Sequence, residues 1–330
     1  MLEQSQPNGT KDSIRIKVLG VGGGGNNAVN QMIKSQIKGA EFYLINTETG
    51  ILDRANTNLC GTLQIGKEAS QGLGAGANPE VGAKAAVESL NEIERILEDT
   101  DLLFLTAGMG GGTGTGATPV IAEAAKRKGI LTVAVVTTPF TFEGKLRSVR
   151  AEAGIEKLKP NVNSLIIISN NQLLKNTENN VSILDAFKLT DDILRQAIES
   201  ITDLIYSVGT INVDFADVKT ILSYEGYSYM GIGEAEGENK IEYSTINALS
   251  NPLTPHRIDG AKGVIFNIKG SEDIGLEDIN KSAEVISKKV DPDANIIFGT
   301  EIDPEIGDKV VVTIVATGLE EGKQNEEENR

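Results

Sequence analysis

The most unusual stretch of the 330-residue chain reads GMGGGTGTG, from Gly108 to Gly116. Six of its nine positions are glycine, and the other three are Met109, Thr113 and Thr115. Such a segment cannot fill a core, and each glycine costs roughly 0.5–1 kcal/mol relative to alanine in regular structure. Without side chains in the way, however, several backbone N–H groups can point at one anion. The two threonines add hydroxyl donors, so the segment is suited to holding phosphate.

Glycine also clusters at residues 22–27 and 72–76, which gives three such loops in one chain. Apolar runs precede the first and the last cluster, at 15–21 and 101–108. A single glycine loop can be a plain tight turn. Three loops that follow strands of one parallel sheet meet at the same edge of that sheet, and this favours a shared ligand site.

The loop GVGGGGNNA contains Gly20-x-Gly22-x-x-Gly25, which is the spacing of the dinucleotide-binding fingerprint. That fingerprint also needs an acidic residue about 20 positions further on, at the end of the second strand. Asn46 and Thr47 stand there instead. The P-loop alternative needs a lysine followed by serine or threonine after its last glycine, and no glycine loop of this chain has it. Phosphate would therefore be held mainly by backbone N–H groups and a helix dipole.

Apolar runs alternate with segments of helical periodicity over the first half of the chain. The apolar runs are continuous, which is typical of strands in a parallel sheet that is covered on both faces. Pro119 and Gly129 bracket one helix, with the proline expected in its first turn. We expect strands at 15–21, 41–47, 101–108, 131–140 and 164–170, and helices at 28–37, 80–98, 117–128 and up to about 158.

A long helix is predicted at 178–205, followed by a second set of elements without glycine-rich loops. These comprise a segment at 211–223, strands at 263–270, 295–302 and 309–318, and a helix at 276–290. The predicted organisation is a flexible tail at 1–12, a ligand-binding α/β domain at 13–177, the central helix at 178–205, a smaller α/β domain at 206–318 and an acidic tail at 319–330.

Composition excludes several classes of function. The net charge of −16 argues against binding to nucleic acid or to anionic membranes. The single cysteine, Cys60, excludes an internal disulfide and suits a reducing compartment, and the single histidine, His256, excludes histidine-rich metal sites. No apolar run approaches the roughly 18–20 residues of a membrane span, and the N-terminus has no signal-peptide core. We therefore expect a cytoplasmic protein without membrane insertion.

GGGTGTG at 110–116 resembles the signature loop of the tubulin/FtsZ family of GTPases, and residues 14–318 resemble the FtsZ branch found in bacteria. The other matching stretches are 16–30, 72–82, 140–147, 212–221 and 230–239. The resemblance implies a Rossmann-like GTPase domain, a central helix and a C-terminal domain that supports polymerisation. It also implies GTP/GDP as ligand, Mg²⁺ with the nucleotide, K⁺ as a further ion, head-to-tail filaments, and a place in the cytokinetic ring at mid-cell.

The resemblance also assigns residues to the nucleotide. Gly112, Thr113 and Gly114 would cradle the phosphates, Glu143 and Arg147 would contact the ribose and nucleotide, and Asn170, Phe187 and Asp191 would form the guanine pocket. A carboxylate can accept from the N1–H and 2-amino groups of guanine, a donor pair that adenine lacks. Without the resemblance, Phe187 could be helix core and Asp191 a solvated side chain. The full expected set is Gly23, Gly24, Gly25, Asn26, Asn27, Gly76, Ala77, Gly110, Gly111, Gly112, Thr113, Gly114, Thr115, Gly116, Glu143, Arg147, Asn170, Phe187 and Asp191.

Asn212, Asp214 and Asp217 match the N-x-D-x-x-D catalytic loop of the family. The bare pattern also fits a helix N-cap followed by a first-turn acid. In the family this loop acts on the nucleotide of the neighbouring subunit, so a single chain would be a poor GTPase. A non-catalytic regulator or capper of filaments is the alternative, although the intact acidic set argues against it.

The chain departs from the family at three places. Glu48 stands where aspartate is usual, Asp192 follows Asp191 where asparagine is usual, and the stretches 205–209 and 223–231 are richer in tyrosine than usual. The long linker and short peptide that bind membrane tethers such as FtsA in the family have no counterpart up to Arg330. The details of metal coordination near Glu48 are the most affected.

Overall fold

The computed structural model describes residues 14–175, 181–206, 214–250, 253–272 and 274–319. Its first half contains six parallel strands in the order β3-β2-β1-β4-β5-β6. This confirms the predicted parallel sheet. The strands are β1 (Ile16–Val21), β2 (Ala40–Asn46), β3 (Gly61–Gln64), β4 (Leu102–Gly108), β5 (Leu131–Thr138) and β6 (Ser164–Ser169).

Helices cover both faces of this sheet, and a separate apolar core fills each side. One face carries α1 (Gly22–Lys34) and the long α9 (Ile183–Tyr206), and the other carries α4 (Pro79–Glu88), α5 (Leu90–Ile96), α6 (Thr113–Arg127) and α7 (Lys145–Leu158). The short helices are α2 (Thr49–Leu52), α3 (Lys67–Ser70) and α8 (Asn170–Lys175).

The C-terminal half adds four strands in the order β7-β10-β8-β9. β10 is antiparallel to both of its neighbours, whereas β8 and β9 are parallel. These strands are β7 (Tyr227–Ala235), β8 (Gly263–Gly270), β9 (Asn295–Ile302) and β10 (Val310–Leu319), with helices α10 (Phe215–Leu222), α11 (Lys240–Ser250) and α12 (Leu276–Ser287).

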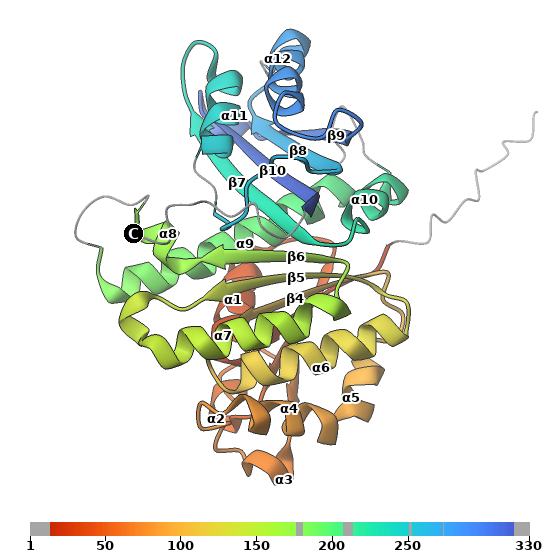
Figure 1. Cartoon of the computed structure of the whole chain (residues 1–330), viewed down its shortest axis with the longest axis vertical. Coiled ribbons are helices and arrows are strands. Elements are labelled where there is room, and N and C mark those ends of the chain that lie inside the picture. Colours follow the sequence, from red (N-terminus) through yellow and green to blue (C-terminus); the bar gives the residue numbers. More distant parts are fainter. Residues whose placement is uncertain (1–13, 176–180, 207–213, 251–252, 273, 320–330) are drawn as a thin grey trace, which may run out of the picture.

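The two halves meet along a narrow seam. β6 and β7 pair only through Leu165 with Tyr227 and Ile166 with Ser228. Helix α9 runs between the halves, below the C-terminal strands and above β5 and β6 in Figure 1. The C-terminal half is therefore held mainly by α9 and by a short piece of sheet.

The structure corrects three helix boundaries. α1 begins at Gly22 rather than near residue 28, because its glycines pack directly on the sheet: a Cβ on Gly25 would lie 2.3 Å from the carbonyl oxygen of Thr106. α6 begins at Thr113, so Pro119 lies in the second turn and not the first. The predicted helix at 80–98 is divided at Ser89, whose Oγ accepts the backbone N–H of Gly66 at 3.0 Å.

Two elements of the C-terminal half, β7 and α11, had no clear pattern in the sequence. β7 contains Gly231 and Gly233, which weaken a strand prediction. In the structure a Cβ on either glycine would lie 2.0 Å from a carbonyl oxygen of α11. The glycines therefore allow α11 to lie directly on β7.

No helix in the described ranges is long and apolar enough to cross a membrane. The expected tail at 1–12 and all but the first residue of the expected tail at 319–330 lie outside these ranges, whereas Leu319 ends β10.

We predict that Gly116→Ala lowers the free energy of unfolding by at least about 2 kcal/mol, because overpacking at a rigid contact forces the backbone to move. A Cβ at Gly116 would lie 1.9 Å from the carbonyl oxygen of Pro79 in α4. Urea unfolding of the purified chain measures the effect. Gly50→Ala is the matched control, since no atom lies within 4 Å of a Cβ at that position in α2. Equal stability of the two variants would contradict the packing argument.

Candidate functional site

The three glycine clusters converge on one cavity of ≈ 420 Å³ at the carboxyl edge of the parallel strands. This is the left edge of the sheet in Figure 1, where β6 runs into α8. The loops that follow β1, β3, β4 and β5 contribute to its wall, together with the first turns of α9. The position agrees with the rule that ligands of open α/β sheets sit beyond the carboxyl ends of the strands.

Fourteen of the nineteen residues expected at the nucleotide line this cavity. They are Gly23, Gly24, Asn27, Gly76, Ala77, Gly111, Gly112, Thr113, Gly114, Glu143, Arg147, Asn170, Phe187 and Asp191. The other five, Gly25, Asn26, Gly110, Thr115 and Gly116, are not part of the cavity lining.

These five residues hold the cavity wall in place from behind. Thr115 Oγ1 accepts the backbone N–H of Gly110 at 2.8 Å, which fixes the turn before α6. Buried Asn26 donates to the Gly20 carbonyl at 2.7 Å and accepts from Asn46 Nδ2 at 2.6 Å. This pair of amides ties the end of β1 to the end of β2.

The glycines of the cavity fall into two groups. A Cβ on Gly112 would lie 2.8 Å from the Cβ of Ala75, and one on Gly114 would lie 2.7 Å from the Gly108 carbonyl oxygen. Packing of the chain therefore requires these two glycines. In contrast, a Cβ on Gly23 or Gly111 would meet no atom within 4 Å. Their lack of a side chain leaves open space in the cavity.

Two helices begin at the cavity, α1 at Gly22 and α6 at Thr113. Their free N-terminal N–H groups and positive dipole ends favour an anion there. Thr113 Oγ1 lies 2.7 Å from Thr47 Oγ1, so a hydroxyl pair joins the start of α6 to the loop after β2. This end of the cavity is built for phosphate.

Glu143, in the segment that links β5 to α7, forms an ion pair with Arg147 in the first turn of α7. Glu143 Oε1 also accepts the backbone N–H of Phe140 at 2.9 Å. The glutamate therefore holds the start of this segment against the first turn of α7. Both side chains border the cavity between its glycine loops and α9.

An aromatic cluster lies at the α9 end of the cavity. Phe187 is 39 % exposed, and its ring meets Phe140 edge-on at 5.3 Å and Phe142 at 6.4 Å. Phe140 and Phe142 stack at 5.0 Å. A flat ligand can pack against Phe187 here, because the ring is held from behind by its neighbours.

Asp191 follows Phe187 by one helical turn and faces the same cavity. Burial raises the pKa of its carboxyl to about 7, and the charge of Lys34 opposes this shift. Nearby Asn170 is buried, and its Oδ1 accepts from Thr190 Oγ1 at 3.2 Å. A carboxylate, an amide and an aromatic face together can recognise a heterocyclic base.

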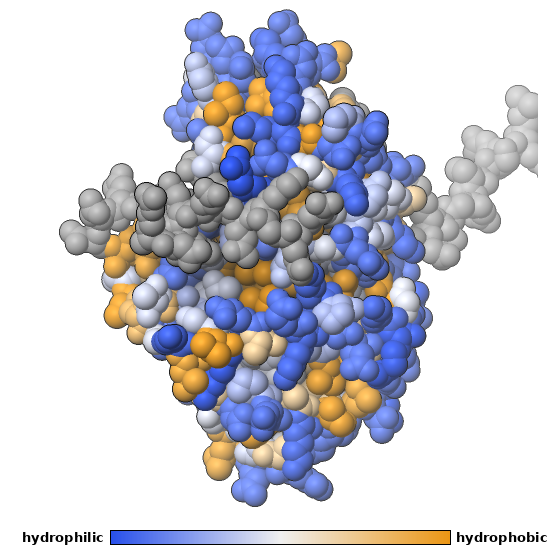
Figure 2. All heavy atoms as spheres, viewed as in Figure 1, coloured by the Kyte–Doolittle hydropathy of each residue, from blue (hydrophilic) through white to orange (hydrophobic). Residues whose placement is uncertain are grey.

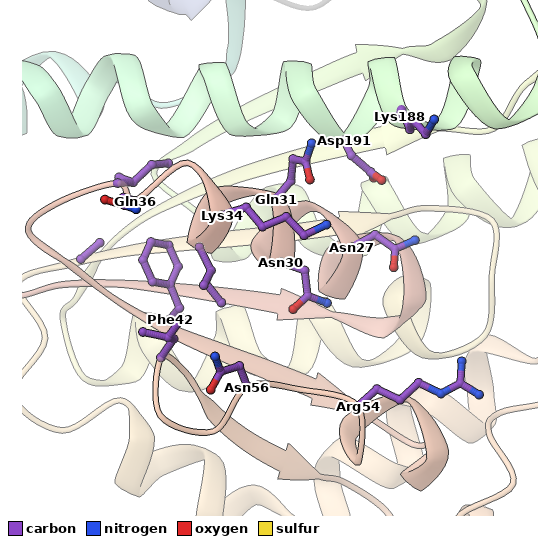
Figure 3. Close-up of a pocket in the computed structure, with 14 residues that line it drawn as sticks. Asn27, Asn30, Gln31, Lys34, Gln36, Phe42, Arg54, Asn56, Lys188 and Asp191 are labelled. Atoms are coloured by element: carbon purple, nitrogen blue, oxygen red, sulfur yellow. The ribbon is translucent and has the colours of Figure 1, made fainter.

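A wider hollow of ≈ 1120 Å³ lies on the other side of α1 and shares Asn27 and Asp191 with the cavity (Figure 3). In Figure 3 Lys34 reaches along α1 toward Asn27, below Asp191. The hollow is lined by side-chain amides, Lys34, Arg54 and Lys188 over an apolar floor that includes Phe42. It contains no glycine loop, so it lacks the feature that predicts a phosphate site in the smaller cavity.

Sequence reasoning missed several residues that line the cavity. Thr137 and Pro139 stand at the end of β5 and the start of the following segment, and Thr190 and Leu194 lie on α9. The position of Thr137 at the carboxyl end of a parallel strand was a usable signal. Thr190 and Leu194 have helical spacing from Phe187 and Asp191 and carry no chemical signal of their own.

The acidic loop lies far from this cavity. Asp214 precedes α10 and Asp217 lies in its first turn; both are exposed and neither lines the cavity. Asp214 makes no side-chain capping hydrogen bond, which removes the main support for a purely structural N-cap. Asn212 lies outside the described residues. Helix α9, which at 24 residues spans about 36 Å, separates the two places, and Figure 1 shows α10 at the end opposite α8.

Comparisons with known proteins match nearly the whole described chain. The model of the tubulin/FtsZ family GTPase domain matches residues 15–178, and that of the FtsZ family C-terminal domain matches residues 226–320. An empty FtsZ dimer from M. jannaschii is 41 % identical with a TM-score of 0.88, covering 93 % of this chain and 89 % of that one. A tryptophan-to-tyrosine point mutant of M. jannaschii FtsZ gives 41 % identity and a TM-score of 0.89 over 94 % and 92 % of the two chains.

A more distant structure shares only the fold. CetZ2 from Haloferax volcanii, in a GTPγS-bound protofilament, is 18 % identical with a TM-score of 0.81, covering 94 % of this chain and 95 % of that one.

The open glycines give a direct test of the phosphate end. We predict that Gly111→Ala changes the free energy of unfolding by less than about 0.5 kcal/mol, as substitutions free of contacts do. The same variant should bind a nucleoside triphosphate at least about tenfold more weakly, since a methyl group would occupy space in the cavity at a cost of about 1.4 kcal/mol. Titration with a fluorescent nucleotide measures the affinity. Unchanged affinity would show that no ligand group lies against Gly111.

Proposed function

The chain belongs to the tubulin/FtsZ family of GTPases, and we propose that it polymerises head to tail and hydrolyses GTP where two subunits meet. The observation that carries this proposal is the separation of two half-sites. The glycine-lined cavity and the acidic loop at α10 lie at opposite ends of α9. A second subunit stacked on the first would bring its acidic loop to the open cavity.

In this proposal the phosphates lie against Gly112, Thr113 and Gly114, where α6 begins. The N–H groups of the loop and the helix dipole would neutralise part of the phosphate charge. Gly23 and Gly111 would leave room for the phosphate oxygens, and the first turn of α1 would supply further N–H groups. The cavity needs no lysine for this task.

The base would pack against Phe187, with Asp191 accepting from the N1–H and 2-amino groups of guanine. Adenine would leave this partly buried carboxylate without its donor pair, and such a mismatch costs up to several kcal/mol. Asn170 borders the same end of the cavity, and Glu143 with Arg147 borders its middle. These placements support GTP and GDP over adenine nucleotides.

Mg²⁺ fits the phosphate end of this site. Mg²⁺ usually takes one or two carboxylates, phosphate oxygens and water in nucleotide sites. Glu48 is a carboxylate of the cavity wall, and its backbone N–H donates to Asn46 Oδ1 at 3.2 Å, which fixes its position after β2. When bound, the ion would screen the phosphate charge. K⁺ remains a prediction, with no described group that singles it out.

The water that attacks the γ-phosphate would be positioned by Asn212, Asp214 and Asp217 of the neighbouring subunit. Exposed carboxylates at the start of α10 are free to approach a partner. A carboxylate can accept a hydrogen bond from water and orient it for attack. Because the contact joins two different surfaces, it repeats without closing and produces an open filament.

The surface around the cavity supports such a contact. Leu73 is 83 % exposed, and Phe142, Leu146, Ile183 and Leu184 are also exposed near the cavity mouth. Figure 2 shows apolar surface along the left edge of the molecule, where α9 begins. Several exposed apolar side chains in one region of the surface are typical of protein contacts.

On this proposal the filament belongs to the cytokinetic ring of a dividing cell, as in the FtsZ branch of the family. The part at 13–177 binds the nucleotide, 178–205 links the halves, and 206–318 supplies the acidic loop. Membrane tethers such as FtsA would be its cellular partners. The alternative is a filament-capping role without hydrolysis, and the next experiment distinguishes the two functions.

We predict that GTP turnover per subunit is near zero at low protein concentration and rises above a threshold, because association completes the site. Asp214→Ala should lower turnover at least about 100-fold, the scale lost with one polar catalytic group, while GTP binding is retained. Phosphate release in Mg²⁺ and K⁺ measures turnover, and Glu98→Ala is a control at an exposed carboxylate that follows α5 and does not line the cavity.

Mixing variants sharpens this test. Gly111→Ala damages the cavity and Asp214→Ala damages the acidic loop, so a mixed filament contains contacts in which both half-sites are intact. Turnover of the mixture should exceed that of either variant alone. Turnover that is independent of concentration, or no gain on mixing, would place the whole site in one chain. GTP binding without any hydrolysis would favour the capping role.

The raised pKa of Asp191 gives a pH prediction. Guanine needs the ionised carboxylate, so GTP affinity should fall about tenfold from pH 8 to pH 6 as a group with a pKa of about 7 takes up its proton. Asp191→Asn should bind GTP weakly and should lack the pH dependence that the carboxyl causes. Titration of the GTP phosphates affects both proteins equally, so it cancels in the ratio of their affinities. A constant affinity ratio of the two proteins over this range would contradict the role of Asp191.

A further inference from the structure

A third cavity, of ≈ 260 Å³, lies between α9 and the C-terminal sheet. Its wall on the α9 side includes Arg195, Glu199 and Asp203, and its wall on the sheet side includes Lys269 of β8 and Glu301 of β9. Polar and charged side chains thus dominate the wall of this cavity, which lies beside the buried apolar contact of Ile201 and Leu204 of α9 with the C-terminal sheet. The cavity wall itself is held weakly, because each charge that faces it has lost part of its hydration.

Each ion pair around this cavity joins two residues of the same wall, either the α9 wall or the sheet wall. Arg195 pairs with Asp192 and Glu199 of its own helix. Lys269 pairs with Glu301 at 2.9 Å and with Asp303 at 3.4 Å, all on the sheet side. No ion pair between described residues joins α9 to the sheet across the cavity.

The remaining charges at the rim behave in the same way. Glu234 of β7 pairs with Lys309, which precedes β10. Across the cavity, Ser200 Oγ donates to Thr313 Oγ1 of β10 at 3.2 Å. One neutral hydrogen bond contributes about 1 kcal/mol, so the side chains that line the cavity add little to the contact.

Asp203 differs from the other acidic side chains of the cavity, each of which has an ion-pair partner. It has no hydrogen bond or ion pair with another described residue, and it faces the carboxylates of Glu301 across the cavity and Glu199 along the helix. Burial is the main cause that raises its pKa, the two glutamates raise it further, and Lys269 and Arg195 oppose them, with a resulting value of about 7.

We propose that Asp203 is a proton-operated contact, in which protonation draws α9 and the C-terminal sheet together and ionisation pushes them apart. A neutral carboxyl removes the repulsion from Glu301 and can donate a hydrogen bond across the cavity. The apolar contact beside the cavity keeps the two halves joined, so the change is confined to the width of the cavity.

The sign follows from linkage. The closed contact raises the pKa of an acid, so it binds the proton more tightly than the open contact does. Closure is therefore favoured as the pH falls and is lost progressively as the pH rises toward and through 7. The range of the change includes neutral pH, so small shifts in pH alter the contact between the nucleotide-binding half and the half that carries the acidic loop.

A disulfide between the two sides measures closure directly. Ser200 and Thr313 touch across the cavity, so the double variant S200C/T313C can form a cross-link when the contact is closed. Cys60→Ala removes the only native thiol. The full-length chain is equilibrated in glutathione redox buffer with GDP, at low concentration, and the cross-linked fraction is measured from pH 5.5 to 8.5.

The comparison uses Asp203→Asn in the same background, since both proteins share the intrinsic pH dependence of thiol exchange. The cross-linking constant of the parent relative to this variant should fall at least about tenfold over the range, because each unit of pKa difference is worth tenfold. Glu305→Gln, at an exposed carboxylate outside the cavity, should behave like the parent. A ratio that stays within about twofold overturns the proposal.

Glu301→Gln supplies a second test that leaves Asp203 in place. Removing the facing carboxylate lowers the pKa of Asp203, so the fall in cross-linking should move to lower pH. A midpoint equal to that of the parent overturns the proposal even if Asp203→Asn does not fold. Since the measurement needs neither filaments nor GTP hydrolysis, its failure is distinct from failure of the proposed function.

Discussion

The rest of the structure depends on one steric constraint, the contact of bare backbone where α1 and α6 leave the sheet. Gly25 lies on the Thr106 carbonyl, and Gly114 lies on the Gly108 carbonyl, at distances that no Cβ tolerates. This contact brings the N-termini of two helices to the same point. The anion site is a consequence of that packing, because the free N–H groups of both helices then face one cavity.

The same constraint explains how much of the site could be predicted. Glycine at 22–25 and 108–116 is visible in any sequence, and parallel strands place such loops at one edge, so the cavity was predictable from pattern alone. The first residues of α1 and α6 were not predictable, because glycine lowers helix propensity while tertiary packing requires glycine at these positions. β7 was hidden for a related reason: Gly231 and Gly233 weaken the strand pattern, and only the close approach of α11 explains them.

The raised pKa values of two carboxyl groups on α9 could not be predicted from the sequence. Nothing in the spacing of α9 distinguishes Asp191 or Asp203 from the solvated acids of the same helix, such as Asp185, whose pKa is lowered by Ser182 and Lys188. The raised values at 191 and 203 arise from burial against other elements. Even the family resemblance, which marks Asp191 as a base contact, gives no reason to expect a carboxyl that titrates near neutral pH.

The carboxyl groups of Asp191 and Asp203 are proposed to act in opposite protonation states, and both lie on α9, the helix that separates the half-sites. On the proposals above, guanine recognition needs Asp191 ionised, whereas closure onto the C-terminal sheet needs Asp203 protonated. Raising the pH favours the first and weakens the second. Since both pKa values are about 7, neither state is complete near neutral pH. Nucleotide affinity and the contact of the two halves therefore share one helix and respond to the same proton concentration in opposite directions, so neither can be strengthened through pH without loss of the other.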